Sequence, residues 1–349
     1  MSVSGTAPMQ ILQLHELYGD VVRIRPNELS FIDPNAWKDI KGQKKAGQEE
    51  NGKDPAIVAS PGLRDSILGA DRDTHARFRR ALAPGFSFKA MLAQEPLIQS
   101  YVDLLMRKLK LQCNDGKTPV DLRNWFNYFT FDLIGDLSFG EPFDCLINAN
   151  YHPWVSIIIH VMQALLFIGI VRRFVPAFDR ISAALTPKRI AEGTARHGQF
   201  THEKVSKRLA LSTSRADFID AILAEDEQNS DAKLTMAEIE SNASVLIVAG
   251  SETSATVLAA SAYHLAMCPD VLNCLAKEIR TSFKSESDIT IVGVGHLKYL
   301  NAVVEESLRA YPPAPWSQPR VIRRGGDIIA GYVVPEGVSF PVDIIDESV

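Results

Sequence analysis

Apolar residues recur at helical spacing along most of the chain, from about Asp71 to Phe283. The clearest helix begins at Thr235, which forms a capping box with Glu238 three residues later. Its apolar periodicity runs to Cys268, where Pro269 ends it. About 33 residues at a rise of 1.5 Å each make this helix roughly 50 Å long. A helix of that length that is apolar around much of its circumference is typical of the centre of a domain.

Alternation of apolar and polar residues with a period of two, which is typical of strands, is confined to the two ends of the chain. Asp20–Asp33 contains two β-prone runs joined by a Pro-Asn pair, which predicts a hairpin. Asp327–Phe340 alternates in the same way and predicts a second hairpin. Amphipathic helices are predicted over Pro269–Phe283 and Leu297–Tyr311, and residues 41–63, rich in Gly, Lys, Gln and Pro, read as a loop. The pattern predicts a mainly α fold with a small β portion, in the α+β class.

Composition adds few constraints. Of the 349 residues, 46% are hydrophobic and 23% charged, which is ordinary for a soluble globular protein of one large or two smaller domains. A net charge of −5 and a pI near 5.9 give no basic field for nucleic acid. Four scattered cysteines do not form a disulfide framework, which fits a reducing compartment. Trp154–Val171 is near the lower length limit of a membrane span, and a buried or channel-lining helix is the alternative.

A polar run interrupts the long helix near its midpoint, in the segment VLIVAGSETSAT. Gly250 has no side chain, so a flat ligand or another backbone can approach it. Thr253 is expected to return its hydroxyl to the carbonyl of Ala249, one turn earlier. Glu252 beside Thr253 pairs an acid with an alcohol, which suits a proton relay if both face a cavity. The alternative is a polar stripe on a partly exposed helix.

Two further segments carry charged groups at helical spacing. Arg72, His75 and Arg79 share one face, which suits an anionic ligand, although a solvated basic face explains the same pattern. Glu306 and Arg309 lie one turn apart and are expected to form an ion pair within their helix, which alone carries no function. The chain contains no HExxH, CxxC or GxSxG motif and no complete dinucleotide fingerprint.

Taken together and in this order, these features resemble the cytochrome P-450 family of haem-thiolate monooxygenases. Ala249–Ser254 is similar to the (A/G)Gx(D/E)T(T/S) signature of the family's long central helix, and Glu306–Arg309 to its ExxR pair. His75-xxx-Arg79 and Pro319-Arg320 resemble the segments that hold the haem propionates. The likeness covers nearly the whole chain. The amino-acid sequence of Asn127–Phe143 is most similar to that of enzymes of fungal secondary metabolism.

The resemblance implies a role for each of these residues. Gly250 would lie against the porphyrin, and Glu252 and Thr253 would deliver protons to iron-bound oxygen. The haem propionates would be held by His75, Arg79 and Arg320, while Glu306 and Arg309 would support the fold. The reaction implied is the insertion of one oxygen atom into an apolar small molecule, with haem as cofactor and electrons from NADPH through a reductase partner.

The resemblance also predicts the organisation of the chain. We expect a single incomplete domain over residues 1–340, with a β-rich part at about 18–63, a helical body at about 64–311 and a β segment at about 319–340, followed by an atypical tail at 341–349. Family members reside at the endoplasmic reticulum membrane, but the printed N-terminus shows neither an anchor nor a signal peptide, which is compatible with a cytoplasmic protein.

One element of the family pattern is absent from residues 1–349. The family binds the haem iron through a Cys thiolate in a later FxxGxRxCxG loop, and none of the four cysteines lies in such a loop: Cys113, Cys145, Cys268 and Cys274. We therefore expect a chain truncated before the haem-ligand segment. After Gly337 the amino-acid sequence departs from similar sequences, beginning with the pair Val-Ser. The nucleotides GTGAGT, a common start of an intron, can encode this pair. Our hypothesis is read-through of an unspliced intron or a truncated gene.

Two other functional interpretations stay open beside the monooxygenase. One is a non-catalytic, haem-free remnant that is inert or acts only as a binding protein. The other is a helical carrier unrelated to the family, which requires all the ordered motifs to coincide by chance. The substrate cannot be read from the sequence, because the residues of its pocket are not identified by any motif.

Overall fold

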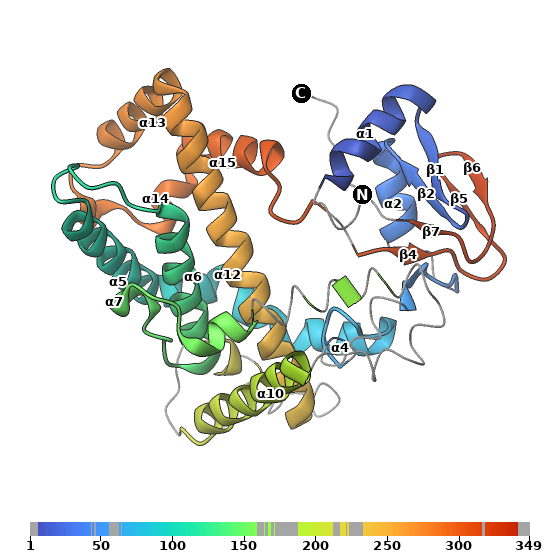
Figure 1. The fold of residues 1–349 in the computed structure, drawn as a ribbon, viewed down its shortest axis with the longest axis horizontal. Helices are drawn as coiled ribbons and strands as arrows, with labels where there is room; N and C mark the ends of the chain where they lie inside the picture. Colours follow the sequence, from blue (N-terminus) through green and yellow to red (C-terminus); the bar gives the residue numbers. More distant parts are fainter. Residues whose placement is uncertain are drawn as a thin grey trace. The chain divides into compact units, whose positions relative to one another are not determined.

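The structure is a computed structural model (Figure 1). It describes residues 6–42, 44, 47–55, 63, 65–158, 164, 167–168, 171, 188–211, 217–220, 222, 233–315 and 318–340. The chain forms two compact units, one made of residues 1–75, 161–191 and 314–349 and the other of residues 76–160 and 192–313. The expectation of a single domain over 1–340 stays a prediction. The mainly α architecture with a small β portion is confirmed.

The first unit contains the β structure. Its five-stranded sheet has the order β1-β2-β7-β4-β3, and a separate antiparallel pair joins β5 to β6. The predicted hairpin at the N-terminal end is the antiparallel pair β1·β2, and the predicted C-terminal hairpin is β5·β6. The strands are β1 (Val21–Arg25), β2 (Glu28–Phe31), β3 (Gly52–Lys53), β4 (Arg320–Val321), β5 (Asp327–Ile329), β6 (Tyr332–Val334) and β7 (Ser339–Phe340).

Two helices of this unit were not predicted: α1 (Ala7–Tyr18) and α2 (Pro34–Lys41). The signal for α2 is local, because the Asp33 carboxylate accepts the Asn35 N–H and Pro34 occupies the first turn. The apolar side of α2 closes a core with the sheet and the second hairpin, made of Phe31, Ala36, Ile40, Ile322, Ile329, Val334 and Phe340. Strand β3 lies inside the predicted loop at 41–63, since two residues are too few for a periodic signal.

The remaining helices form the body of the chain. Figure 1 shows α12 running beside α6 and α15 in the second unit, and these pairs are in direct contact. The helices are α4 (Arg72–Leu82), η1 (Ala83–Phe86), α5 (Phe88–Cys113), α6 (Leu122–Phe139), α7 (Cys145–Asn148), α10 (Lys188–Leu209), α12 (Met236–Met267), α13 (Pro269–Ser282), η3 (Glu286–Asp288), α14 (Ile291–Gly295) and α15 (Lys298–Ala310).

Helix α12 follows its prediction closely. Thr235 accepts the Glu238 N–H, and the Glu238 carboxylate accepts the Thr235 N–H, so the capping box is confirmed. The helix then continues through the polar run without a break as far as Met267. By length and composition it could cross a membrane, but the core helix of a soluble protein satisfies the same criterion. Half of the other proposed span, Trp154–Val171, lies outside the described residues.

Close contact between α6 and its neighbours depends on two glycines. A Cβ on Gly250 of α12 would lie 2.7 Å from Cδ1 of Ile134, and a Cβ on Gly135 would lie 2.6 Å from the ring of Phe143. Both separations are far below van der Waals contact, so a side chain at either position displaces its neighbour. Gly250 therefore allows α12 to lie close to α6, and Gly135 allows the loop that precedes α7 to lie close to α6.

Candidate functional site

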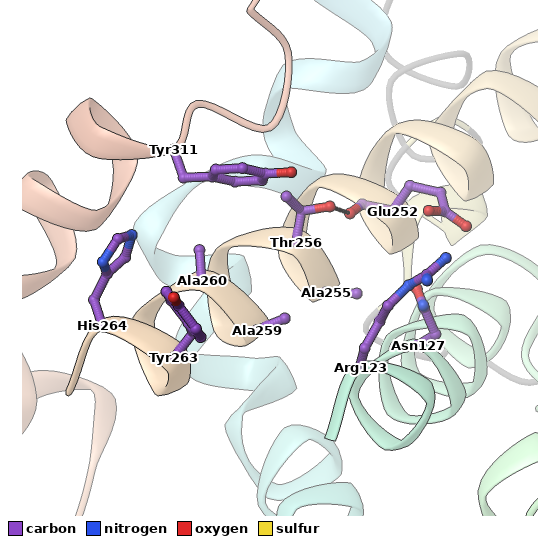
Figure 2. Close-up of a pocket in the computed structure, with 10 residues that line it drawn as sticks. All are labelled: Arg123, Asn127, Glu252, Ala255, Thr256, Ala259, Ala260, Tyr263, His264 and Tyr311. Carbon is purple, nitrogen blue, oxygen red and sulfur yellow. Dashed lines mark hydrogen bonds between the residues drawn. The ribbon is translucent and has the colours of Figure 1, made fainter. Parts of the chain in front are cut away.

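A cavity of about 530 Å³ lies along the C-terminal half of α12, entirely within the second unit (Figure 2). One wall consists of small side chains of α12, and the beginning of α6 and the residue that follows α15 supply the others. The lining residues are Arg123, Asn127, Glu252, Ala255, Thr256, Ala259, Ala260, Tyr263, His264 and Tyr311. The cavity combines an apolar floor with a few polar groups, as small-molecule sites do.

Glu252 is the acidic group of this cavity. Its side chain is half-buried, and burial raises its pKa, while the charge of Arg123 lowers it. Figure 2 shows the Arg123 side chain directed toward the Glu252 carboxylate, with Asn127 beside it. Burial and then the charge of Glu252 raise the pKa of the neighbouring Tyr151 to about 12. The carboxyl group is thus held in a setting that favours keeping a proton and has a cation within reach.

Arg123 and Asn127 were not predicted as site residues. They lie four residues apart on α6, so they present their side chains on one face of that helix. This spacing was visible in the sequence, but it acquires meaning only when α6 is placed against α12. Nothing in the sequence alone identifies which helix faces Glu252.

Three hydroxyl groups of the segment VLIVAGSETSAT bond within α12. Thr253 donates to the carbonyl of Ala249, as predicted, and Thr256 donates to the carbonyl of Glu252 at 2.8 Å. Ser251 makes the equivalent bond one turn back. These bonds give the three hydroxyls an acceptor within their own helix, which explains how α12 accommodates them. The cavity wall includes Glu252 but not Thr253, because adjacent residues of a helix point about 100° apart.

Gly250 has a structural function that the sequence does not reveal. The position where its side chain would stand is filled by Ile134 of α6. Its lack of a Cβ therefore serves the packing of two helices in the second unit. Contact with a porphyrin, the role expected from the resemblance, stays a prediction.

The predicted anion-binding residues are divided between the two units. His75 and Arg320 belong to the first unit, and Arg79 belongs to the second. His75 is half-buried on α4, whereas Arg79 is exposed on the same helix. Arg320 lies in β4, and its Nη1 donates to the carbonyl of Asn51 at 3.3 Å. Its Nε is buried and has no hydrogen-bond partner among the residues that the structure describes.

The other charged groups singled out in the sequence have nearby partners. Nε of Arg72 lies 3.5 Å from the carboxylate of Glu50. Arg309 and Glu306 form the predicted pair within α15, with two hydrogen bonds of 2.8 and 2.6 Å. The Glu306 side chain is 61% exposed, so this pair by itself adds little stability. Arg77, which was not predicted, donates hydrogen bonds from Nη1 and Nη2 to the Glu238 carboxylate and ties α4 to the capping box of α12.

Haem needs an anion-binding end and an iron ligand, and the residues present fit only the first. The orphaned Nε of Arg320 suits a carboxylate. Among the cysteines, Cys145 is buried and accepts the His152 N–H, and burial raises the pKa of its thiol to about 12, which opposes the thiolate that iron requires. Cys113 donates to a carbonyl at the end of α5, and Cys268 and Cys274 are exposed near the start of α13.

Comparison with known proteins agrees with these motifs. The family profile of Cytochrome P450 matches residues 3–344. The chain is 45% identical over 337 residues to a trichothecene C-15 hydroxylase of Fusarium sporotrichioides, covering 96% of this chain and 68% of that protein. It is 42% identical over 350 residues to the cytochrome P450 monooxygenase astJ of Aspergillus oryzae, covering 97% of this chain and 67% of that protein. It is 39% identical over 346 residues to an averantin hydroxylase of Dothistroma septosporum, covering 98% of this chain and 63% of that protein. The chain thus spans about two thirds of the length of these relatives.

Proposed function

Because the chain belongs to the cytochrome P450 family, we propose that it is part of a monooxygenase that hydroxylates an apolar small molecule in fungal secondary metabolism. The reaction class consumes one O₂, two electrons and two protons, places one oxygen atom in a C–H bond of the substrate and releases the other as water. Haem, when bound, supplies the redox chemistry that activates O₂. The observation that carries the proposal is the half-buried Glu252 on the wall of an α12 cavity, within the family's central motif.

Several residues of this chain would act around that group. His75, Arg79 and Arg320 would bind its carboxylates, in keeping with the orphaned Nε of Arg320. Glu252 would hold and release a proton, and burial, which raises its pKa, favours the protonated form needed for delivery. The hydroxyl of Thr253, aligned by its bond to Ala249, would orient the proton path.

The partners follow from the family. Electrons would come from NADPH through a reductase, and the substrate would be an apolar small molecule. Relatives named for hydroxylation of a trichothecene and of averantin support this substrate class without identifying the compound. The endoplasmic reticulum membrane is the proposed location by analogy with the family.

A second candidate function is a non-catalytic chain that binds no haem. It is favoured by one observation, the unsuitable setting of the cysteines, above all the buried thiol of Cys145. The two candidates differ in a property that is simple to measure, because only the first requires stoichiometric binding of haem.

Titration of the purified 349-residue chain with haem, followed by absorbance, tests this choice. We expect saturable binding of one haem per chain. Arg79→Gln should weaken this binding about tenfold, since it removes a charged hydrogen bond. Arg80→Gln is the matched control on the next exposed position of α4 and should leave the affinity unchanged. Absence of saturable binding by the wild-type chain would favour the haem-free candidate.

A further inference from the structure

Arg77 fastens α4 to the start of α12 within the second unit. Its Nη1 donates to the Glu238 carboxylate at 3.1 Å and to the carbonyl of Lys233 at 3.0 Å, and its Nη2 donates to the other carboxylate oxygen. The side chains of Arg77 and Glu238 are only 26% and 17% exposed. A bidentate pair of an arginine with a carboxylate fixes both distance and orientation. Two segments 161 positions apart in the sequence are thereby held in one geometry.

Glu238 serves two structures at once. Its carboxylate accepts the N–H of Thr235 at 2.8 Å, which closes the capping box of α12, and it also accepts the two bonds from Arg77. The hydrogen bond from Arg77 is the largest cause that lowers the pKa of Glu238, so the carboxylate stays charged at neutral pH. The first turn of α12 and the middle of α4 therefore depend on the same charged group.

Apolar contacts alone do not fix the rotation of α4 about its axis. The helix buries Phe78, Ala81 and Leu82, which belong to the second unit, but the hydrophobic effect is not directional. A helix of 11 residues is only marginally stable by itself, so its tertiary contacts decide how it lies. Arg77 supplies a directional contact that the apolar side chains cannot provide.

Arg79 lies on the opposite side of α4 from Arg77. Successive residues of a helix point about 100° apart, so a separation of two residues turns the side chain by about 200°. Arg77 faces Glu238, whereas Arg79 is exposed. Any rotation of α4 about its axis that broke the pair with Glu238 would turn Arg79 through the same angle. The pair therefore sets the direction in which Arg79 projects.

We propose that Arg77 and Glu238 form a positioning pair that holds Arg79 where it binds a carboxylate of haem. The proposal rests on the proposed function, which assigns a haem carboxylate to Arg79. It adds two residues that act through Arg79 and do not touch the ligand themselves. Loss of either partner leaves the side chain of Arg79 intact but frees α4 to turn. The affinity for haem then falls although no contact with the ligand has been deleted.

Haem titration of the 349-residue chain tests the pair through a cycle of variants. Arg77→Gln should weaken haem binding about fivefold, and so should Glu238→Gln, which can keep the capping box because glutamine also serves at that position. The two changes together should cost no more than either alone, since both remove the same contact. In a chain that already carries Arg79→Gln, Arg77→Gln should have no further effect. A purely structural residue would weaken binding equally in both backgrounds.

Amide hydrogen exchange of the chain without haem measures the order of α4 directly. We expect the amides of α4 to exchange about tenfold faster in Arg77→Gln and in Glu238→Gln than in the wild type. Arg77→Lys should fall between them and the wild type, because its point charge lacks the planar fork. The matched controls are Arg80→Gln, at an exposed position of α4, and Glu240→Gln, whose carboxylate bonds to His202. Both controls should leave the exchange of α4 unchanged.

Urea denaturation establishes that each variant is folded. The positioning pair is overturned if Arg77→Gln leaves the exchange of α4 unchanged, or if it weakens haem binding equally with and without the side chain of Arg79. Haem binding that is the same in Arg77→Gln and the wild type overturns the pair and leaves the proposed function intact. Absence of haem binding by the wild-type chain contradicts the proposed function and, with it, the role given to the pair.

Discussion

Replacing Asp132 by alanine is expected to destabilise the second unit by about 3 to 5 kcal/mol, because it leaves three buried backbone N–H groups without an acceptor. Asp132 lies on α6 and is 1% exposed. One carboxylate oxygen accepts the N–H groups of Phe143 and Cys145 at 3.1 and 3.0 Å, and the other accepts that of Leu146 at 2.8 Å. This single side chain thus satisfies the turn that leads into α7.

Urea denaturation measures the loss. Asp132→Asn separates the number of hydrogen bonds from the charge, because the amide oxygen can keep two of the bonds while its NH₂ group faces the third donor. We expect the free energy of unfolding to fall in the order wild type, Asp132→Asn, Asp132→Ala. If Asp132→Ala unfolds at the wild-type midpoint with an unchanged slope, the carboxylate does not stabilise this turn.

A second large effect is expected at Arg208, whose side chain is 1% exposed. Its Nε donates to the equally buried Asp217 at 2.7 Å, and its Nη2 donates to Asp220 at 2.6 Å. Arg208→Met should cost about 3 to 5 kcal/mol, because it leaves buried carboxylate charge without its partner. The carboxylates can then remain charged only if this segment unfolds locally; otherwise they take up protons and become neutral.

Lys207→Gln is the matched control for this change. Lys207 is the preceding residue of α10, its side chain is 64% exposed, and it pairs with Glu141. Its loss should cost less than about 1 kcal/mol. A combined change of Arg208, Asp217 and Asp220 to apolar residues should recover most of the stability lost in Arg208→Met. Equal unfolding midpoints for Arg208→Met and Lys207→Gln would contradict this account of the buried pair.

The sequence predicted those features whose cause is local. Helix α12 has its capping box, its apolar period and its terminal proline within one segment, so both ends were found. The bond from Thr253 to Ala249 and the pair of Glu306 with Arg309 span a single helical turn and were also found. The fold class follows from such periodic segments.

Features that depend on distant partners were not predicted. Lys53 lies beside Arg320 only because two-residue strands pair them, and the contact of Arg320 with Asn51 joins residues 269 positions apart. Arg123 acquires a role only when α6 packs against α12. The sequence also explained only part of why residue 250 is glycine. Ile134, from a different helix, occupies the space that the missing side chain leaves.

The central claim is that residues 1–349 provide the carboxylate-binding and proton-handling parts of a cytochrome P450 haem site without the thiolate that binds the iron. The most direct test is the absorption spectrum of the haem-loaded chain after reduction and addition of carbon monoxide. We predict that the band typical of haem-thiolate proteins is absent, because none of the four cysteines lies in the family's ligand loop and burial raises the pKa of Cys145 to about 12. Appearance of that band in the purified 349-residue chain would contradict the claim.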